Sequence, residues 1–267
     1  MSRIFQINKK IFPFTKKIKI SGDKSLSIRW VLLASQAVGK SRAYNLLMSQ
    51  DVLSAIDSIK KLGIKVKITD NYCEIYGNGI NGFKYKKNLK LNAKNSGTLA
   101  RLILGLLIKS PLKVKLIGDN SLSKRDFLRV TLPLEKFGAK FYYKKKGRLP
   151  LSILGSKSVK GINYFENKGS AQCKSSVMLA ALSASGTTSI KAKKSRNHSE
   201  LLFKYLKIPI KVKITKKYDF IDIKPPRKIP AFNYQIPGDI SSSAFFVALT
   251  TLANDSILLI KNVNINS

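Results

Sequence analysis

Histidine and cysteine are almost absent from this sequence. It contains one histidine, His198, and two cysteines, Cys73 and Cys173, which lie a hundred residues apart. Zinc sites and Ser-His-Asp triads need more histidine than this, and two distant cysteines form neither a disulfide framework nor a metal-ligand cluster. We therefore expect no metal site in this chain.

Long apolar stretches and export signals are missing as well. The longest apolar core of an expected helix, Leu102 to Ile108, is seven residues long, far short of the about 18 residues that suggest a membrane span. The N-terminal stretch from Met1 to Ile20 is basic and mixed, and it has no apolar core of signal-peptide length. We expect a soluble, cytoplasmic protein that has no membrane partner.

Acidic residues are scarce, with 14 Asp and Glu against 50 Lys and Arg, which gives a formal net charge of +36. Only nine of the basic residues are arginines, and the lysines are spread through the whole chain. A nucleic-acid interface usually gathers its basic residues on one face and relies on arginine for paired contacts. The diffuse lysines argue against nucleic acid as the main partner, whereas the positive field favours small anionic substrates.

The sequence instead contains a repeat, because a unit of roughly seventy residues begins four times. The first residues of these units are spaced by 72 (Ser25 to Gly97), 73 (to Ser170) and 71 (to Ser241) positions. Each unit begins with a short Gly/Ser turn that leads into a helix. Helix N-termini with small polar residues are suited to binding phosphate and carboxylate groups.

Within each unit we expect the order helix, strand, helix, strand, strand. In the first unit an apolar helix is followed by an extended segment, an amphipathic helix and two strands, at Leu26–Ala37, Ser41–Leu46, Val52–Leu62, Ile64–Ile68 and Tyr72–Tyr76. The apolar helices of the next two units are expected at Leu99–Leu107 and Cys173–Ala184. This pattern indicates an architecture in which helices line the core and strands cover them.

A proline-rich linker, Pro225 to Pro230, follows the third unit. We therefore expect three complete units to form one lobe over residues 20–230, and residues 231–267 to begin a second lobe.

The group Lys24, Ser25 and Arg29 is the most informative candidate site. On a helix that begins near Ser25, Lys24 lies at the turn and Arg29 one turn later, so both could face one anion. The simpler interpretation is a basic turn in which Ser25 is the N-cap. Arg29, however, lies in an otherwise apolar helix where an unpaired cation would be costly, which favours ligand binding.

The second helix start repeats this arrangement with Gly97 and Arg101, and Gly97 would let a ligand approach the backbone closely. Arg125 and Arg129 follow at the start of the next helix, where arginine suits paired contacts with a carboxylate or phosphate. A salt bridge to a nearby acid, Asp126 or Glu135, is an equally good interpretation of these two arginines.

The third helix start contains Ser170, Ala171 and Gln172, and Arg196 precedes the outer helix of that unit. Ser195 is interpreted as an N-cap, with Glu200 completing a loose capping box. We interpret His198 as a helix-start residue without chemistry and Cys173 as a packing residue rather than a nucleophile. The helix starts and arginines together indicate a polyanionic small-molecule ligand.

These motifs, in this order and spacing, resemble the 3-phosphoshikimate 1-carboxyvinyltransferase (5-enolpyruvylshikimate-3-phosphate synthase) family. The likeness covers essentially the whole chain and is carried by the runs Ser21 to Arg29, Asn95 to Arg101, Lys124-Arg125, Ser170 to Lys174, Ser195 to Glu200 and Pro237 to Ala244. The resemblance implies an α/β protein, the inside-out α/β barrel built of repeated βαβαββ units. It further implies that residues 1–19 join 231–267 in a partial second lobe.

The resemblance also implies roles for the motif residues. Those expected to bind shikimate 3-phosphate are Lys24, Ser25, Arg29, Ser170, Ala171, Gln172 and Arg196. Those expected to bind phosphoenolpyruvate are Lys24, Gly97, Arg125 and Gln172. No cofactor is implied, and we expect a monomer. Family members continue well beyond the position of Ser267, and the resemblance implies that the carboxylates for proton transfer lie there, so that this chain alone is an inactive fragment.

Two alternatives remain open. An enolpyruvyl transferase acting on a UDP-sugar shares the fold, but it typically uses a cysteine in the loop that corresponds to Gly118–Asp126, and this loop has none. A basic RNA-binding protein built of βαβαββ units is the alternative from a different class. Binding to RNA would weaken steeply with ionic strength and show little preference for phosphoshikimate.

Overall fold

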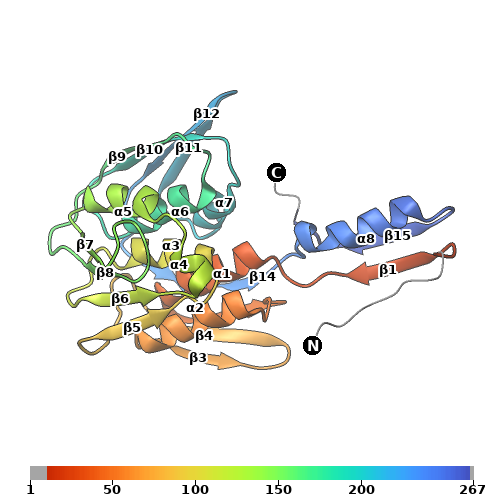
Figure 1. The fold of residues 1–267 in the computed structure, drawn as a ribbon, viewed down its shortest axis with the longest axis horizontal. Coiled ribbons are helices and arrows are strands. Elements are labelled where there is room, and N and C mark those ends of the chain that lie inside the picture. Colours follow the sequence, from red (N-terminus) through yellow and green to blue (C-terminus); the bar gives the residue numbers. More distant parts are fainter. Residues whose placement is uncertain (1–10, 265–267) are drawn as a thin grey trace.

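Three buried helices form the centre of the main lobe, and three mixed sheets surround them (Figure 1). The computed structural model describes residues 11–264. The helices are α1 (Lys24–Ser35), α2 (Gln50–Lys61), α3 (Gly97–Leu106), α4 (Asn120–Ser123), α5 (Leu128–Glu135), α6 (Ala171–Ala181), α7 (His198–Tyr205) and α8 (Ile240–Leu252).

The central helices α1, α3 and α6 are apolar on nearly every side, as helices surrounded by protein must be. They run parallel, because contacts between them join residues at matching positions from each helix start. Gln172 Nε2 donates to Thr98 Oγ1 at 3.0 Å, Ser176 Oγ donates to the carbonyl of Arg101 at 2.8 Å, and Arg29 Nη2 on α1 donates to Ser175 Oγ on α6 at 2.9 Å. Helix α3 also approaches α6 very closely, since a Cβ atom on Gly105 would collide with the carbonyl of Ser176. The N-termini of the three helices therefore lie at one end of the lobe.

Each sheet repeats one topology. In the second unit, β5 (Leu89–Asn92) pairs in parallel with β6 (Val114–Ile117), and β8 (Leu151–Leu154) lies antiparallel between β6 and β7 (Lys140–Tyr143). The third unit has the same order with β9 (Asn163–Glu166), β10 (Thr188–Lys193), β12 (Tyr218–Ile223) and β11 (Ile210–Ile214).

The first unit takes its first strand from the far end of the lobe. Its strands β2 (Ala37–Tyr44), β4 (Tyr72–Asn78) and β3 (Lys65–Ile68) follow the common order, and β13 (Ile229–Pro230) and β14 (Asn233–Gln235) pair in parallel with β2. This pairing closes the ring of three units. Strand β14 continues the sheet beyond residue 230, where we expected the lobe to end, and the division into lobes stays a prediction.

The expected helices and closing strands are present within a few residues of their predicted bounds, and the inside-out α/β architecture is confirmed. The order predicted from the residue pattern alone was incomplete, because each unit begins with a strand before its buried helix, as the βαβαββ order implied by the resemblance has it. Strands β5 and β9 are only four residues long and are rich in polar side chains, so neither stood out from the neighbouring loops.

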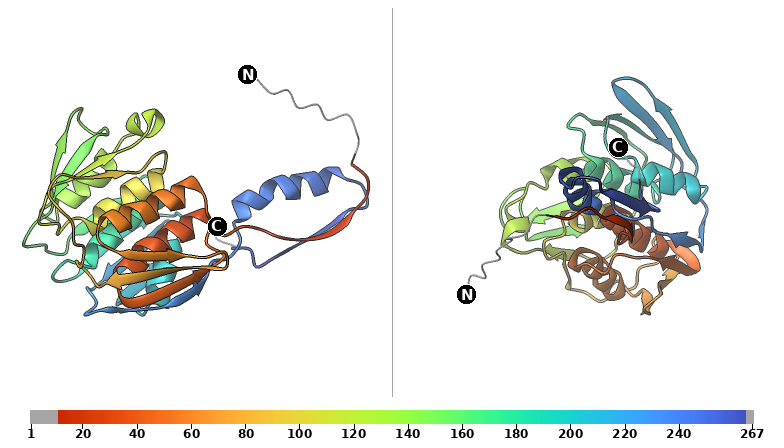
Figure 2. Two further views of the ribbon diagram at one scale, coloured as in Figure 1. Left: turned by 90° about the horizontal axis from the view of Figure 1, so that it is seen from below. Right: turned by 90° about the vertical axis from the view of Figure 1, so that its right-hand side faces the viewer.

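The chain ends of the described region form an arm that projects from the lobe (Figure 2). Strand β1 (Thr15–Lys19) pairs in parallel with β15 (Ile257–Lys261), and α8 packs against β15. The arm joins the lobe where Asp23 N donates to the carbonyl of Pro237 at 2.8 Å and Asp239 N donates to the carbonyl of Ser21 at 3.0 Å. Residues 1–10 and 265–267, which belong to the predicted second lobe, lie outside the described residues.

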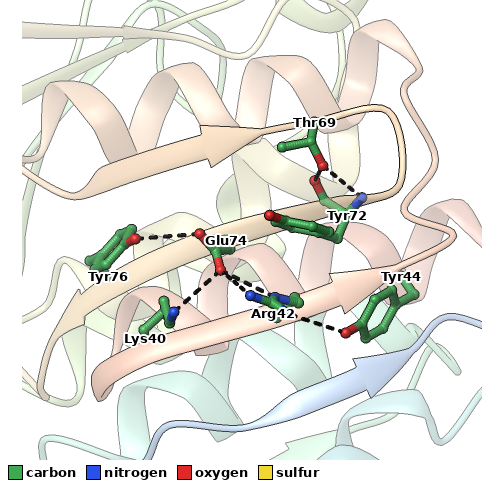
Figure 3. A network of polar contacts seen from close by, with 7 residues as sticks. All are labelled: Lys40, Arg42, Tyr44, Thr69, Tyr72, Glu74 and Tyr76. Atoms are coloured by element: carbon green, nitrogen blue, oxygen red, sulfur yellow. Dashed lines mark hydrogen bonds and ion pairs between the residues drawn. The ribbon is translucent and has the colours of Figure 1, made fainter.

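Lysine and arginine side chains cover aromatic rings on the outer faces of the sheets. On the first sheet, Arg42 Cζ lies 4.3 Å from the centre of the Tyr72 ring, and Arg42 Nη2 lies 2.6 Å from Glu74 Oε1 (Figure 3). The ammonium of Lys40 approaches the same carboxylate at 3.5 Å, and Glu74 is only 4% exposed. The hydrogen bond from Arg42 is the main cause that holds the pKa of Glu74 below its ordinary value.

Substitution of Glu74 should change stability in a pH-dependent way. A carboxyl whose pKa is lowered by folding stabilises the fold above its unfolded-state pKa, about 4.3, and loses this contribution as the pH falls through the folded-state value. Glu74→Gln should therefore lower the urea midpoint at pH 7, and the difference from the parent should shrink in acid. The exposed pair Lys61–Asp57 is the control, so Asp57→Asn should change the midpoint very little. An equal loss for Glu74→Gln at both pH values would contradict the electrostatic origin.

Candidate anion-binding site

The N-termini of the three central helices are capped by the residue before each helix. Asp23 Oδ1 accepts from Leu26 N at 2.8 Å on α1, Ser96 Oγ accepts from Leu99 N on α3, and Ser170 Oγ accepts from Cys173 N on α6. The interpretation of Ser25 as an N-cap was therefore wrong, because Asp23 holds that position. Since Ser25 is not needed for capping, its hydroxyl is available at the first turn of α1.

A first cluster surrounds Gly97 at the start of α3. A Cβ atom at this position would lie 2.8 Å from Arg101 Nη1 and 3.0 Å from Arg125 Nη1, so both guanidinium groups lie against the glycine. Arg101 Nη1 donates to Gln172 Oε1 at 2.9 Å, and Arg125 Nη2 donates to Asn95 Oδ1 at 3.1 Å. These contacts bring together Gly97, Arg125 and Gln172, three of the residues expected to bind phosphoenolpyruvate.

The two guanidinium groups of this cluster have neutral partners. Within residues 11–264, neither Arg101 nor Arg125 forms an ion pair with a carboxylate. Burial, and then the positive charges of Arg125 and Arg129, lower the pKa of Arg101. Two cations at a positive helix end repel each other, and an anion bound between them would relieve this repulsion.

A second cluster lies below the N-termini of α1 and α6. Arg29 is 4% exposed, and its Nε donates to Ser199 Oγ at 2.9 Å. Its Nη2 donates to Ser175 Oγ at 2.9 Å, and its Nη1 donates to the carbonyl of Ser25 at 3.1 Å. Arg29 therefore ties the first turn of α1 to α6 and α7, through residues far away in the sequence.

The remaining candidates lie around these clusters. Lys24 is exposed and forms an ion pair with Asp51, with 3.2 Å between Nζ and Oδ2. Arg196 is exposed and donates from Nη2 to Ser241 Oγ on α8 at 3.4 Å. Ser170 and Ala171 are half-buried at the start of α6. The helix geometry thus brings the predicted residues to one end of the lobe, while the roles assigned to them stay predictions.

Several interpretations of single residues can now be decided. Arg125 does not pair with Asp126 or Glu135 in the described region, whereas Arg129 does form an ion pair, with Glu166 at 3.4 Å. Cys173 is buried, and burial raises the pKa of its thiol, as expected for a packing residue.

The start of α7 differs from its predicted capping box. Asn197, not Ser195, occupies the N-cap position, and Glu200 forms an ion pair with Lys174. Burial is the main cause that lowers the pKa of His198 to about 4, so this imidazole is neutral at pH 7.

Two polar groups have surroundings that the sequence analysis did not predict. Arg101 holds the side-chain amide of Gln172, which itself donates to Thr98 Oγ1. The buried hydroxyl of Ser195 has no hydrogen-bond partner within residues 11–264. The i to i+4 spacing of Gly97 and Arg101 was a signal for the first group, but no local pattern distinguishes Ser195 from an ordinary cap.

The repeated βαβαββ units around three central helices have the enolpyruvyl transferase fold. A family model described as EPSP synthase (3-phosphoshikimate 1-carboxyvinyltransferase) matches residues 9–267, and the chain belongs to this family. None of the helices in residues 11–264 is long and apolar enough to cross a membrane.

Individual relatives agree with this assignment. The 3-phosphoshikimate 1-carboxyvinyltransferases of Bacillus subtilis and Streptococcus mutans are 39% and 40% identical over 252 and 251 residues, respectively. These alignments cover 94% and 93% of this chain and 58% of each relative. The structure of EPSP synthase from Acinetobacter baumannii matches with a TM-score of 0.86 and 31% identity over 96% of this chain and 58% of that one. The chain thus spans somewhat over half the length of the relatives it matches.

Removal of the Arg125 guanidinium should weaken anion binding at the first cluster. A charge-assisted hydrogen bond contributes about 1.5–3 kcal/mol, so Arg125→Ala should raise the dissociation constant for phosphoenolpyruvate about ten- to hundredfold in calorimetry. Arg129→Ala is the matched control, because that guanidinium is paired with Glu166 and should affect binding little. Equal effects of both substitutions would indicate a general loss of positive charge rather than a site at Arg125.

Proposed function

We propose that this chain supplies the substrate-binding lobe for transfer of the enolpyruvyl group from phosphoenolpyruvate to the 5-hydroxyl of shikimate 3-phosphate, with release of phosphate. One observation carries the proposal: Arg101 and Arg125 meet at the N-terminus of α3, beside Gln172. Within residues 11–264, the hydrogen-bond partners of both guanidinium groups are neutral. Membership of the family supports the choice of substrates.

Phosphoenolpyruvate is proposed to bind at the first cluster. Arg125 would pair with one of its anionic groups, and the absence of a Cβ on Gly97 lets the ligand approach the helix end. Lys24 would reach the same ligand after leaving Asp51, since that exposed ion pair is weak.

Shikimate 3-phosphate is proposed to bind beside it. Lys24, Ser25 and Arg29 would contribute from α1, and Ser170, Ala171 and Gln172 from the start of α6, with Arg196 at the edge. Gln172 lies on α6 and contacts α3, so it would be shared by the two proposed ligand sites. This sharing would hold the two substrates side by side, which is itself a large part of catalysis.

The chemistry requires charge stabilisation and proton transfer. The 5-hydroxyl gives up its proton to a base and its oxygen forms a bond to C2 of phosphoenolpyruvate, while C3 gains a proton from an acid. The resulting tetrahedral intermediate then loses phosphate from C2 and a proton from C3. Fixed cations beside the carboxylate and the departing phosphate stabilise the charge that develops.

The nearby carboxylates are already engaged in structural contacts. Asp23 caps α1, Asp119 caps α4, Glu166 accepts from Ser170 N, and Glu200 pairs with Lys174. We therefore assign substrate binding to the two clusters, and proton transfer to groups other than these four carboxylates. The monomeric state and cytoplasmic location stay predictions.

Calorimetry with shikimate 3-phosphate tests the binding half of the proposal. The purified chain should bind this ligand in preference to shikimate, because the proposed contacts include the cations Lys24, Arg29 and Arg196. An RNA oligonucleotide of equal charge is the control for the diffuse positive field. Absence of any heat at millimolar phosphoshikimate would contradict the proposal.

Phosphate release from the two substrates tests the reaction. Because the carboxylates nearest the clusters have structural roles, the chain alone should show no turnover. The chain joined to the part of the B. subtilis relative that it does not match should release phosphate only when both substrates are present. Turnover by the chain alone would show that one of these carboxylates acts as an acid or base.

A further inference from the structure

A layer of polar side chains is buried beneath the proposed phosphoshikimate site. Ser175 on α6 and Ser199 on α7 are 1% and 3% exposed. Their hydroxyls are linked to each other at 2.7 Å, and each accepts one hydrogen bond from the Arg29 guanidinium at 2.9 Å. Helices α6 and α7 begin 147 and 174 residues after the start of α1, so this layer exists only in the folded lobe.

Two cations, Arg29 and Lys174, and two carboxylates, Glu200 and Asp23, lie around this layer. Lys174 is fully buried, and its Nζ lies 2.6 Å from Glu200 Oε1. Burial lowers the pKa of Arg29 to about 10, and the negative charge of Glu200 is the first of the influences that oppose this. Glu200 forms an ion pair with Lys174, whereas Arg29 forms no ion pair with a carboxylate within residues 11–264.

The direct partners of Arg29 are oxygens of neutral groups. Two are hydroxyls and one is the Ser25 carbonyl. A carboxylate in the place of Ser175 or Ser199 would neutralise the guanidinium, whereas the hydroxyls fix its orientation and leave its charge in place. A fixed cation that has no carboxylate in direct contact, and that lies beneath a helix N-terminus, attracts a dianionic phosphate.

We propose that Ser175 and Ser199 are positioning residues for Arg29 in the phosphoshikimate site. They hold the guanidinium against the first turn of α1, where Ser25 lies, and they tie the start of α7, which follows Arg196, to α6. The choice of ligand rests on the function proposed above, but the fixation of Arg29 does not depend on it.

Calorimetry on the full chain tests the effect on binding. Replacement of both hydroxyls, in Ser175→Ala/Ser199→Ala, should raise the dissociation constant for shikimate 3-phosphate about tenfold and leave that for phosphoenolpyruvate nearly unchanged. The single variant Ser199→Thr keeps the hydroxyl oxygen at this position and should retain near-parental affinity. Ser58→Ala is the matched control, because Ser58 is also a buried helical serine, and its hydroxyl donates to the carbonyl of Ser54 far along α2.

NMR of the Arg29 Nε–H group provides a readout without any ligand. Its signal is assigned by its absence in Arg29→Lys. The Nε–H proton should exchange with solvent about tenfold faster in the double variant than in the parent or in Ser58→Ala. Unchanged exchange, or equal weakening of both substrates, would overturn the positioning role. If the parent binds no phosphoshikimate but the exchange result holds, the function proposed above fails and the positioning role remains.

Discussion

Parallel packing of α1, α3 and α6 is the constraint on which the site depends. Each helix is apolar on nearly all sides, and α3 approaches α6 so closely that position 105 must be glycine. Parallel packing brings three positive helix ends together, and each cap satisfies only one of the unpaired N–H groups of its helix. The arginines add further positive charge at this end. Positive charge is therefore concentrated at this end of the lobe, and a bound polyanion would relieve the repulsion. The fold and the proposed site thus have one physical origin.

The sequence predicted the architecture well because the repeated element is a helix with an unambiguous signature. A nearly all-apolar helix that follows a small polar turn is easily recognised, and three of them at a constant spacing imply one repeated unit. The short strands β5 and β9 have no such signature, since half of their residues are polar and their pairing partners lie across a helix. Closure of the ring by β14 was missed because pairing with β2 joins residues about 190 positions apart.

The candidate site shows the same division between local and distant information. Motif positions predicted which residues gather at the helix ends, but not what they touch. Arg29 finds its hydroxyl partners 146 and 170 residues away. The alternative that Ser25 is a cap was open because a serine at a helix start usually is one, whereas Asp23, two residues earlier, takes that position. Partners such as these are determined by helix packing, which no spacing along one segment specifies.

The small number of carboxylates decides which arginines remain available to a ligand. Glu74 and Glu166 neutralise Arg42 and Arg129, and Glu200 neutralises a buried lysine. At the helix ends, by contrast, Arg29, Arg101, Arg125 and Arg196 donate to hydroxyl, amide and carbonyl oxygens. Neutral acceptors orient a guanidinium without cancelling its field. In a chain with so few acids, the distribution of carboxylates is therefore as much a part of the anion site as the cations themselves.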